Sequence, residues 1–155
     1  MRTPHSLFRH SHWLAIGVAA ILATGCATMP GKRPTVLTGA QEVPSVATRA
    51  SGHADISVDS FKCPSAASSN NCPTIVGVVT ATGMNGTVAE IRDGAPGQNG
   101  ALIVTLDKVR DNMWQVPSGT TLTDAQYRDY WADRLYVNVD SSMHKDGEIR
   151  AQLKP

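Results

Sequence analysis

Apolar and polar residues alternate most regularly near the end of the chain, in segments 135–140 and 148–153. The apolar positions are Leu135, Val137 and Val139, then Ile149, Ala151 and Leu153. Successive side chains of a strand point to opposite faces, so this pattern predicts two strands, each with one apolar and one polar face. Asp146 and Gly147 provide turn residues for a hairpin between them. The pattern leaves open whether the polar face binds a ligand or is simply solvated.

Further short segments rich in β-branched residues lie upstream, separated by Gly and Pro. They begin at Val36, Ala50, Thr74, Thr87 and Ala101. With the terminal pair they make about seven strands, and only one segment has a helical pattern. This arrangement predicts an all-β fold, an antiparallel Greek-key β-sandwich with one short helix.

The helix is predicted at about 124–132. Thr123 and Gln126 have the spacing of a capping box, which satisfies free backbone N–H groups at a helix start. Three aromatic residues share one side of this helix, namely Tyr127, Tyr130 and Trp131. We expect these aromatics to pack against the edge of the sandwich.

Composition narrows the classes of function. A chain of 155 residues with 41% hydrophobic residues can form one domain with a core. The formal net charge of +1 gives no basic surface for binding nucleic acid. We therefore expect no nucleic-acid partner.

The amino-terminal segment has the pattern of an export signal. Basic residues precede an apolar run at 13–23, which at 11 residues is too short to span a bilayer. The run ends L-A-T-G-C, which resembles the bacterial lipobox, in which the cysteine is lipidated and becomes the new amino terminus. Residues 1–25 are therefore predicted to be a lipoprotein signal peptide and Cys26 the lipidated residue. Ordinary secretory cleavage near Ala27 is the alternative.

The segment after Cys26 predicts a tether. Residues 26–35 mix small residues, Pro and Gly, as a flexible linker does, and the folded domain is expected at 36–155. Ala27 after the cysteine resembles the outer-membrane sorting pattern. We expect a domain anchored by lipid to the outer membrane and facing the periplasm, with an envelope protein or glycan as a candidate partner. The alternative is a soluble secreted protein.

Two further cysteines, Cys63 and Cys72, flank P-S-A-A-S-S-N-N, a segment rich in turn residues. In an oxidising compartment, a disulfide between them would stabilise the fold by about 2–3 kcal/mol. A metal pair is the rival interpretation, but no third Cys or His lies nearby in the sequence. The disulfide is preferred.

Five separated segments together resemble the CHRD domain, first described in chordin and widespread in bacterial secreted proteins. They read V-L-T-G-A-Q-E-V-P, D-G-A-P-G-Q-N-G-A-L-I-V-T-L, W-Q-V-P-S-G-T-T-L-T-D-A-Q, L-Y-V-N-V-D and G-E-I-R-A-Q-L. The resemblance extends from about Val36 to Leu153. It implies an all-β sandwich, and by analogy with chordin it favours a binding module over an enzyme.

The chain departs from the family pattern at three positions. Family members typically carry H-I-H and N-V-H, whereas this chain has E-I-R at 90–92 and N-V-D at 138–140. Three imidazoles on neighbouring strands could bind a metal, but the charge of Arg92 would repel a divalent cation. We therefore expect no metal or other cofactor, and an exposed ionic cluster in which Arg92 bridges Glu90 and Asp140. The neighbouring polar face comprises Asn138, Glu148 and Arg150.

The chain contains no recognisable catalytic motif such as G-x-S-x-G or H-E-x-x-H. His53 and His144 have no partner at ligand spacing and are expected to be solvated. A glycan hydrolase using Glu90 with Asp140 or Glu148 remains an alternative, although Arg92 is expected to lower the carboxyl pKa values. An altered metal or redox site is another alternative. The preferred hypothesis is a non-enzymatic binding or structural module.

Overall fold

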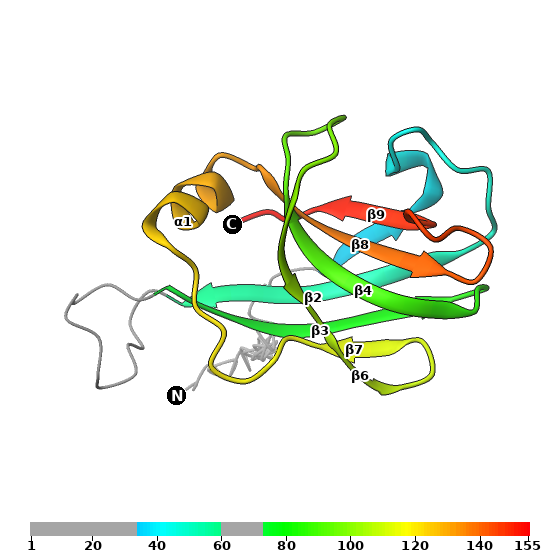
Figure 1. Cartoon of the computed structure of the whole chain (residues 1–155), viewed down its shortest axis with the longest axis horizontal. Helices are drawn as coiled ribbons and strands as arrows, with labels where there is room; N and C mark the ends of the chain where they lie inside the picture. Colours follow the sequence, from blue (N-terminus) through cyan, green and yellow to red (C-terminus); the bar gives the residue numbers. More distant parts are fainter. Residues whose placement is uncertain (1–33, 60–72) are drawn as a thin grey trace, which may run out of the picture. The chain divides into compact units, whose positions relative to one another are not determined.

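The computed structural model describes residues 34–59 and 73–155, all within one compact unit, Gly31–Pro155 (Figure 1). The predicted signal peptide, the lipidation site Cys26 and the cysteine pair Cys63 and Cys72 lie outside the described residues. The described residues contain no helix with the length and apolar character needed to cross a membrane.

Nine strands, one 3-10 helix and one α-helix make up the described part of the chain. The elements are β1 (Thr35–Thr38), η1 (Gly39–Gln41), β2 (Ser51–Asp59), β3 (Thr74–Thr82), β4 (Gly86–Asp93), β5 (Ala101–Thr105), β6 (Asp107–Arg110), β7 (Met113–Gln115), α1 (Asp124–Trp131), β8 (Leu135–Ser141) and β9 (Ile149–Gln152). The strands pair in the order β5-β4-β8-β9-β1-β2-β3-β7-β6, and every pair is antiparallel.

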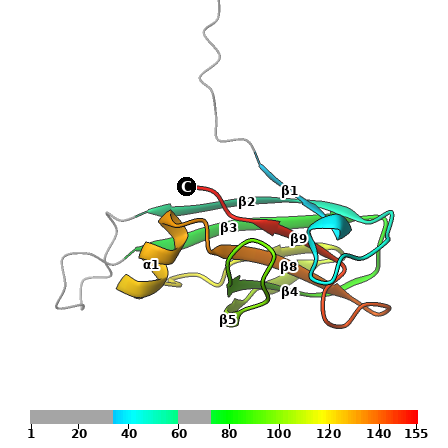
Figure 2. The same ribbon diagram turned by 90° about the horizontal axis from the view of Figure 1, so that it is seen from above.

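The single sheet folds over on itself. Strands β4, β8 and β9 form one layer and β2 and β3 lie in the other (Figures 1 and 2). The two end strands of the sheet, β5 and β6, are consecutive in the chain and are separated only by Leu106. The sheet is therefore nearly closed. The prediction of an all-β antiparallel fold with one short helix is confirmed, and both layers belong to one continuous sheet.

The core lies between the layers and consists mostly of aliphatic side chains supplied by alternate strand positions. Trp114 of β7 is the largest of the fully buried side chains. Gly86 at the start of β4 accommodates its indole, because a Cβ at that position would lie 2.5 Å from Trp114 Cη2. The absence of a side chain at Gly86 therefore leaves the space that the Trp114 ring occupies.

Sequence reasoning missed β6 and β7. All four residues of β6 are exposed and β7 has only three residues, so neither strand shows a readable alternation of apolar and polar positions. Their pairing depends on neighbouring strands rather than on their own sequence, since β7 pairs with both β3 and β6.

The helix α1 has the predicted capping box. Gln126 N donates to Thr123 Oγ1 at 3.2 Å, and Thr123 N donates to Gln126 Oε1 at 2.8 Å. Tyr130 is buried as expected, whereas the side chain of Trp131 is 60% exposed. The expectation that Trp131 packs against the sandwich is therefore wrong. Instead, its ring meets Tyr127 and Tyr130 edge-on, so the contact is within the helix.

Candidate functional site

The polar face of β8 and β9 is covered. Tyr136, Asn138 and Arg150 are 2%, 5% and 1% exposed. The alternative of a simply solvated face is therefore wrong for these strands. The loop after β4, residues 94–100, and the segment after η1 supply contacts to this face (Figure 1). Alternation along a strand cannot reveal such a cover, because it arises from segments far away in the sequence.

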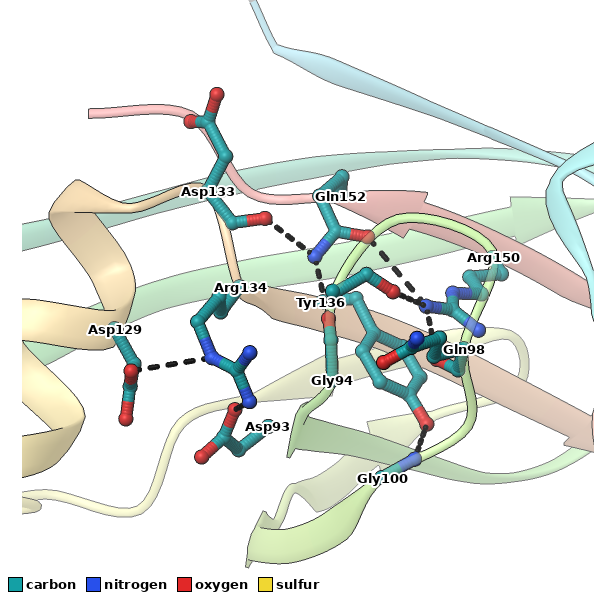
Figure 3. Close-up of polar contacts among 11 residues, drawn as sticks. Asp93, Gly94, Gln98, Gly100, Asp129, Asp133, Arg134, Tyr136, Arg150 and Gln152 are labelled. Carbon is teal, nitrogen blue, oxygen red and sulfur yellow. Dashed lines mark hydrogen bonds and ion pairs between the residues drawn. The ribbon is translucent and has the colours of Figure 1, made fainter.

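One end of this face is centred on Arg150 (Figure 3). We call it the saturated corner, because the guanidinium of Arg150 has several partners within the protein. Its guanidinium lies 3.5 Å from the centroid of the Tyr136 ring, a cation–π contact. Nη2 donates to the carbonyl of Gln98 at 2.9 Å, and Nη1 donates to Asn99 Oδ1 at 3.2 Å. Desolvation lowers the pKa of Arg150. The contacts tie the loop after β4 to the sheet.

Gln152 and Tyr136 complete the attachment of this loop. Gln152 Nε2 donates to the carbonyls of Gly94 at 2.8 Å and Asp133 at 2.7 Å, and the Tyr136 hydroxyl accepts from Gly100 N at 3.1 Å (Figure 3). Both ends of the loop are therefore held by side chains from β8 and β9. These polar residues have structural partners, and their role is to position the loop.

The other end of the face borders an open cleft of about 870 Å³. Its lining combines the segment 42–46, Glu90 and Arg92 of β4, polar residues of β8 and the turn 143–147. Figures 1 and 2 place η1 and the turn between β8 and β9 at the same end of the sandwich, away from α1. Segments distant in sequence therefore form this cleft together.

Glu42 is the most unusual residue of the cleft. Its side chain lines the cleft, yet the residue is only 6% exposed. No group in the described part of the chain donates a hydrogen bond to Oε1. Desolvation raises the pKa of Glu42 to about 7, with a further increase from Asp140, while Arg150 and a backbone hydrogen bond oppose the shift. A carboxyl group thus lies in the cleft without a complete set of donors.

Asp140 is a second carboxyl group with an altered pKa. Desolvation and the nearby charge of Glu90 raise the pKa of Asp140 to about 6, although Arg92 acts in the opposite direction. Its Oδ1 accepts a hydrogen bond from Asn138 Nδ2 at 2.6 Å. Arg92 lowers this pKa as expected, but the expected net lowering is wrong, because partial burial and the charge of Glu90 have the larger effect.

The predicted ionic cluster forms only in part. Arg92 Nε lies 2.7 Å from Glu90 Oε2, and Arg92 Nη1 donates to the carbonyl of Gly100 at 3.0 Å. Among the described residues, Asp140 forms no ion pair with Arg92. The bridge from Arg92 to both carboxylates is therefore absent there, because the guanidinium is shared between Glu90 and the loop after β4.

Glu148 and Arg150 do not extend that cluster. Glu148 is 6% exposed, and its Oε1 accepts from Thr48 Oγ1 at 2.6 Å. The hydrogen bonds of Arg150 go to the loop after β4. Burial and separate partners thus divide the polar face into a structural part and the cleft. The prediction of one network of exposed charges is wrong for these two residues.

Sequence reasoning missed Glu42 and the contribution of His144. Glu42 follows η1 in a segment with no strand pattern, so only its presence in the family-like V-L-T-G-A-Q-E-V-P stretch distinguished it. His144 lines the cleft instead of being fully solvated, whereas His53 is exposed. Gly147 allows close approach here, since a Cβ would lie 2.7 Å from Asn138 Oδ1 and 2.8 Å from Glu42 Oε2.

The cleft does not have the ligand geometry of a metal site. No group of three or more His, Cys, Asp or Glu residues within 34–59 and 73–155 is arranged to hold a metal ion. At the positions where family members carry the H-I-H pair, Glu90 and Arg92 form an ion pair. Because the Arg92 guanidinium is bound to Glu90, the Glu90 carboxylate is less available to a metal ion, and the positive charge of Arg92 would repel a divalent cation.

The family comparison covers most of the chain. The CHRD domain model matches residues 33–153, which include every described helix and strand. No curated protein and no solved structure gives a significant match. The family match agrees with the segments that suggested the resemblance. The chain therefore belongs to the CHRD domain family.

Proposed function

We propose that the protein is an exported, lipid-anchored envelope protein whose CHRD domain binds a ligand in the cleft beside Glu42 and is not an enzyme. The observation that carries the binding proposal is the buried Glu42 carboxyl, which lines an open polar cleft and has an oxygen without a donor. Leaving a buried polar atom unpaired costs about 1–3 kcal/mol. A bound ligand that supplies a donor would offset that cost.

The architecture supports this role for the cleft. The saturated corner around Arg150 fixes the loop after β4, and Asn99 of that loop also lines the cleft. Binding sites are often formed by loops held on a rigid scaffold. The nearly closed sheet provides that scaffold, while residues of the cleft come from the segment 42–46, β4, the loop after β4, β8 and the turn after β8.

The test is a binding screen with envelope fragments, including muropeptides, oligosaccharides and polyamines, measured by calorimetry on the mature chain. We expect saturable binding of at least one class, weakened by Glu42→Gln combined with Asp140→Asn. The control is Asp55→Asn, which removes an exposed carboxylate on β2. Absence of saturable binding, or equal binding by the double variant, would contradict the proposal.

Anchoring is tested separately. The export motif predicts that Cys26 carries lipid, so the wild-type chain should fractionate with membranes and yield a lipid-modified amino-terminal peptide by mass spectrometry. The matched variant is Cys26→Ser, which should move to the soluble fraction. A wild-type chain that is cleaved near Ala27 and carries no lipid would contradict anchoring without affecting the binding proposal.

A hydrolase acting on envelope glycans is the second candidate function. It is favoured by two carboxyl groups in one cleft with raised pKa values, about 7 for Glu42 and about 6 for Asp140. A carboxyl of raised pKa is the group that protonates a leaving oxygen in glycoside hydrolysis. Turnover of peptidoglycan fragments that is abolished by Glu42→Gln but retained by Glu148→Gln would establish this activity.

A further inference from the structure

We propose that the cleft beside Glu42 binds an organic cation, a ligand that carries a primary ammonium or guanidinium group. This inference rests on the proposed binding function and names the chemical class of the ligand. It follows from the hydrogen-bonding groups that the cleft presents, from its charge balance and from the poorer fit of a metal ion or a sugar.

The most buried carboxyl group of the cleft lining, Glu42, presents an unfilled acceptor. Glu42 and Asn138 are 6% and 5% exposed, and both line the cleft. Asn138 Nδ2 donates one of its two N–H groups to Asp140 Oδ1 at 2.6 Å, and the amide oxygen Oδ1 is an acceptor. Among the described residues, no group donates a hydrogen bond to Oε1 of Glu42. A ligand that fills this acceptor must therefore bring an N–H or O–H group.

The charge balance favours a cation over a neutral donor. Acidic side chains outnumber basic ones in the lining, which contains Glu42, Glu90, Asp140 and Asp146 against Arg92 and Lys145. Arg150 faces Glu42 from β9, but its hydrogen bonds go to the loop after β4. Arg92 is already engaged with Glu90. A ligand that carries a positive charge would gain hydrogen bonds to ionised acceptors, which are stronger than bonds between neutral groups.

An ammonium or guanidinium group fits these acceptors better than a metal ion does. A divalent cation requires several oxygens converging at about 2.0–2.6 Å, and no set of three potential ligands in the described ranges has that arrangement. N–H donors point in several directions and reach acceptors at about 2.9 Å, so they can serve oxygens that do not converge.

A sugar is a poorer match because it usually needs an exposed aromatic surface as well as polar groups. Tyr136 is the aromatic residue of the cleft lining within the part of the chain described, and it is only 2% exposed. Arg150 lies over the Tyr136 ring, with 3.5 Å between the guanidinium carbon and the ring centroid. The ring therefore offers little surface for stacking a pyranose.

Binding should become stronger as the pH rises. The groups facing Glu42 are Arg150 on β9 and Asp140 on β8, and those facing Asp140 are Glu90 and Arg92 on β4 and Asp146 in the turn. His144 and Lys145 of the same turn also line the cleft. A carboxyl with a pKa of about 7 is mostly protonated at pH 5.5 and mostly ionised at pH 8. Only the ionised form attracts a cation.

The test uses the full mature chain and the probe 1-aminopentane, with 1-pentanol as the uncharged match. Binding is followed by NMR shifts of backbone amides around the cleft. We expect the amine to bind and to lose roughly tenfold or more in affinity between pH 8 and pH 5.5, because Glu42 is neutralised over that range. Pentanol should bind at least roughly tenfold more weakly at pH 8. 1-Pentylguanidine, which has no ammonium group, tests the guanidinium form of the probe and should show the same dependence on pH.

Variants localise the effect. Glu42→Gln keeps the shape of the side chain and should weaken amine binding by roughly tenfold at pH 8, whereas Asp55→Asn on β2 should leave it unchanged. The amide spectrum establishes that each variant is folded. The comparison of amine with pentanol on the wild-type chain needs no variant and remains decisive if Glu42→Gln fails to fold.

The outcomes separate the two levels of the proposal. Binding of muropeptides or sugars at the cleft without any preference for the amine would overturn the organic-cation inference and leave the binding function standing. Stoichiometric calcium binding that excludes the amine would also overturn it. If no probe or envelope fragment shifts the cleft amides, both the inference and the proposed binding function fail.

Discussion

The two ends of the polar face formed by β8 and β9 each have a buried ionisable side chain, but the two side chains differ in their hydrogen-bond partners. At one end, Arg150 is 1% exposed, stacks on Tyr136 and donates to the loop after β4. At the other end, Glu42 approaches the face from the segment after η1. It faces Arg150 and is almost equally buried, but its Oε1 has no donor among the described residues. Burial is similar in the two places, whereas the supply of hydrogen-bond partners differs.

The difference separates a structural charge from a candidate binding charge. A buried charge whose hydrogen bonds are made within the protein stabilises one arrangement of its neighbours. A buried charge without enough partners costs stability, and such sites often have a function that requires them. The two ends of the face therefore predict different responses to substitution.

The largest effect is expected from Arg150→Met. This change removes the cation–π contact and the donors to Gln98 and Asn99. We expect the free energy of unfolding to fall by about 3 kcal/mol, because several charge-assisted hydrogen bonds are lost at a buried position. Urea denaturation measures this change, and hydrogen exchange should show faster exchange in the loop 94–100. A loss below about 1 kcal/mol would remove the distinction between the two ends.

The next effect is expected from Gly147→Ala. The backbone at Gly147 has φ of +123°, a conformation that disfavours residues with a side chain. The added Cβ would also lie 2.8 Å from Glu42 Oε2. We expect a loss of about 2 kcal/mol in thermal or urea unfolding, together with weaker ligand binding. The control is Gly97→Ala, because Gly97 also has a positive φ, of +77°, but no atom of the described residues lies within 4 Å of its Cβ position. This variant measures the effect of the backbone conformation without a steric clash.

Glu42→Gln should change stability in a way that depends on pH. The folded pKa of about 7 lies above the ordinary 4.5, so folding favours the protonated carboxyl. This contribution is full below pH 4.5 and is lost as the pH rises through 7. The Glu42→Gln variant has no such loss, because its amide does not ionise. Its free energy of unfolding relative to that of the wild type should therefore rise by about 1–2 kcal/mol from pH 5 to pH 8. Urea titrations at both pH values measure it, and a difference independent of pH would contradict the burial of an ionisable Glu42.

The smallest effect is expected for the pair of Glu90 and Arg92. Their side chains are 13% and 33% exposed, and the atoms are 2.7 Å apart. A double-mutant cycle with Glu90→Gln and Arg92→Gln should give a coupling of about 0.5–1 kcal/mol, because solvent and salt weaken such pairs. A coupling above about 2 kcal/mol would contradict this expectation. It would mean that the pair stabilises the fold as the contacts of Arg150 do.

Much of the fold could be predicted from the sequence because local patterns determine it. Alternating residues identify β8 and β9, and the capping box of Thr123 and Gln126 identifies the start of α1. Strands β6 and β7 could not be predicted, since one is fully exposed and the other has three residues. Their structure depends on neighbours that are distant in the sequence.

The candidate site was less predictable for a related reason. The sequence identified Glu90, Arg92 and Asp140 through their places in the family pattern, and the structure places all three in the cleft lining. It did not identify Glu42, because burial by other segments gives this residue its unusual pKa. Nor could it show that Arg150 and Glu148 bond elsewhere. Pairing of charges depends on tertiary distance, which alternation along one strand does not contain.

The single residue between β5 and β6 also bears on self-association. Sheet proteins form fibres when molecules add strand to strand through two separate free edges. Here the carboxyl end of one terminal strand and the amino end of the other are joined through Leu106. The topology therefore disfavours open-ended polymerisation through two separate edges.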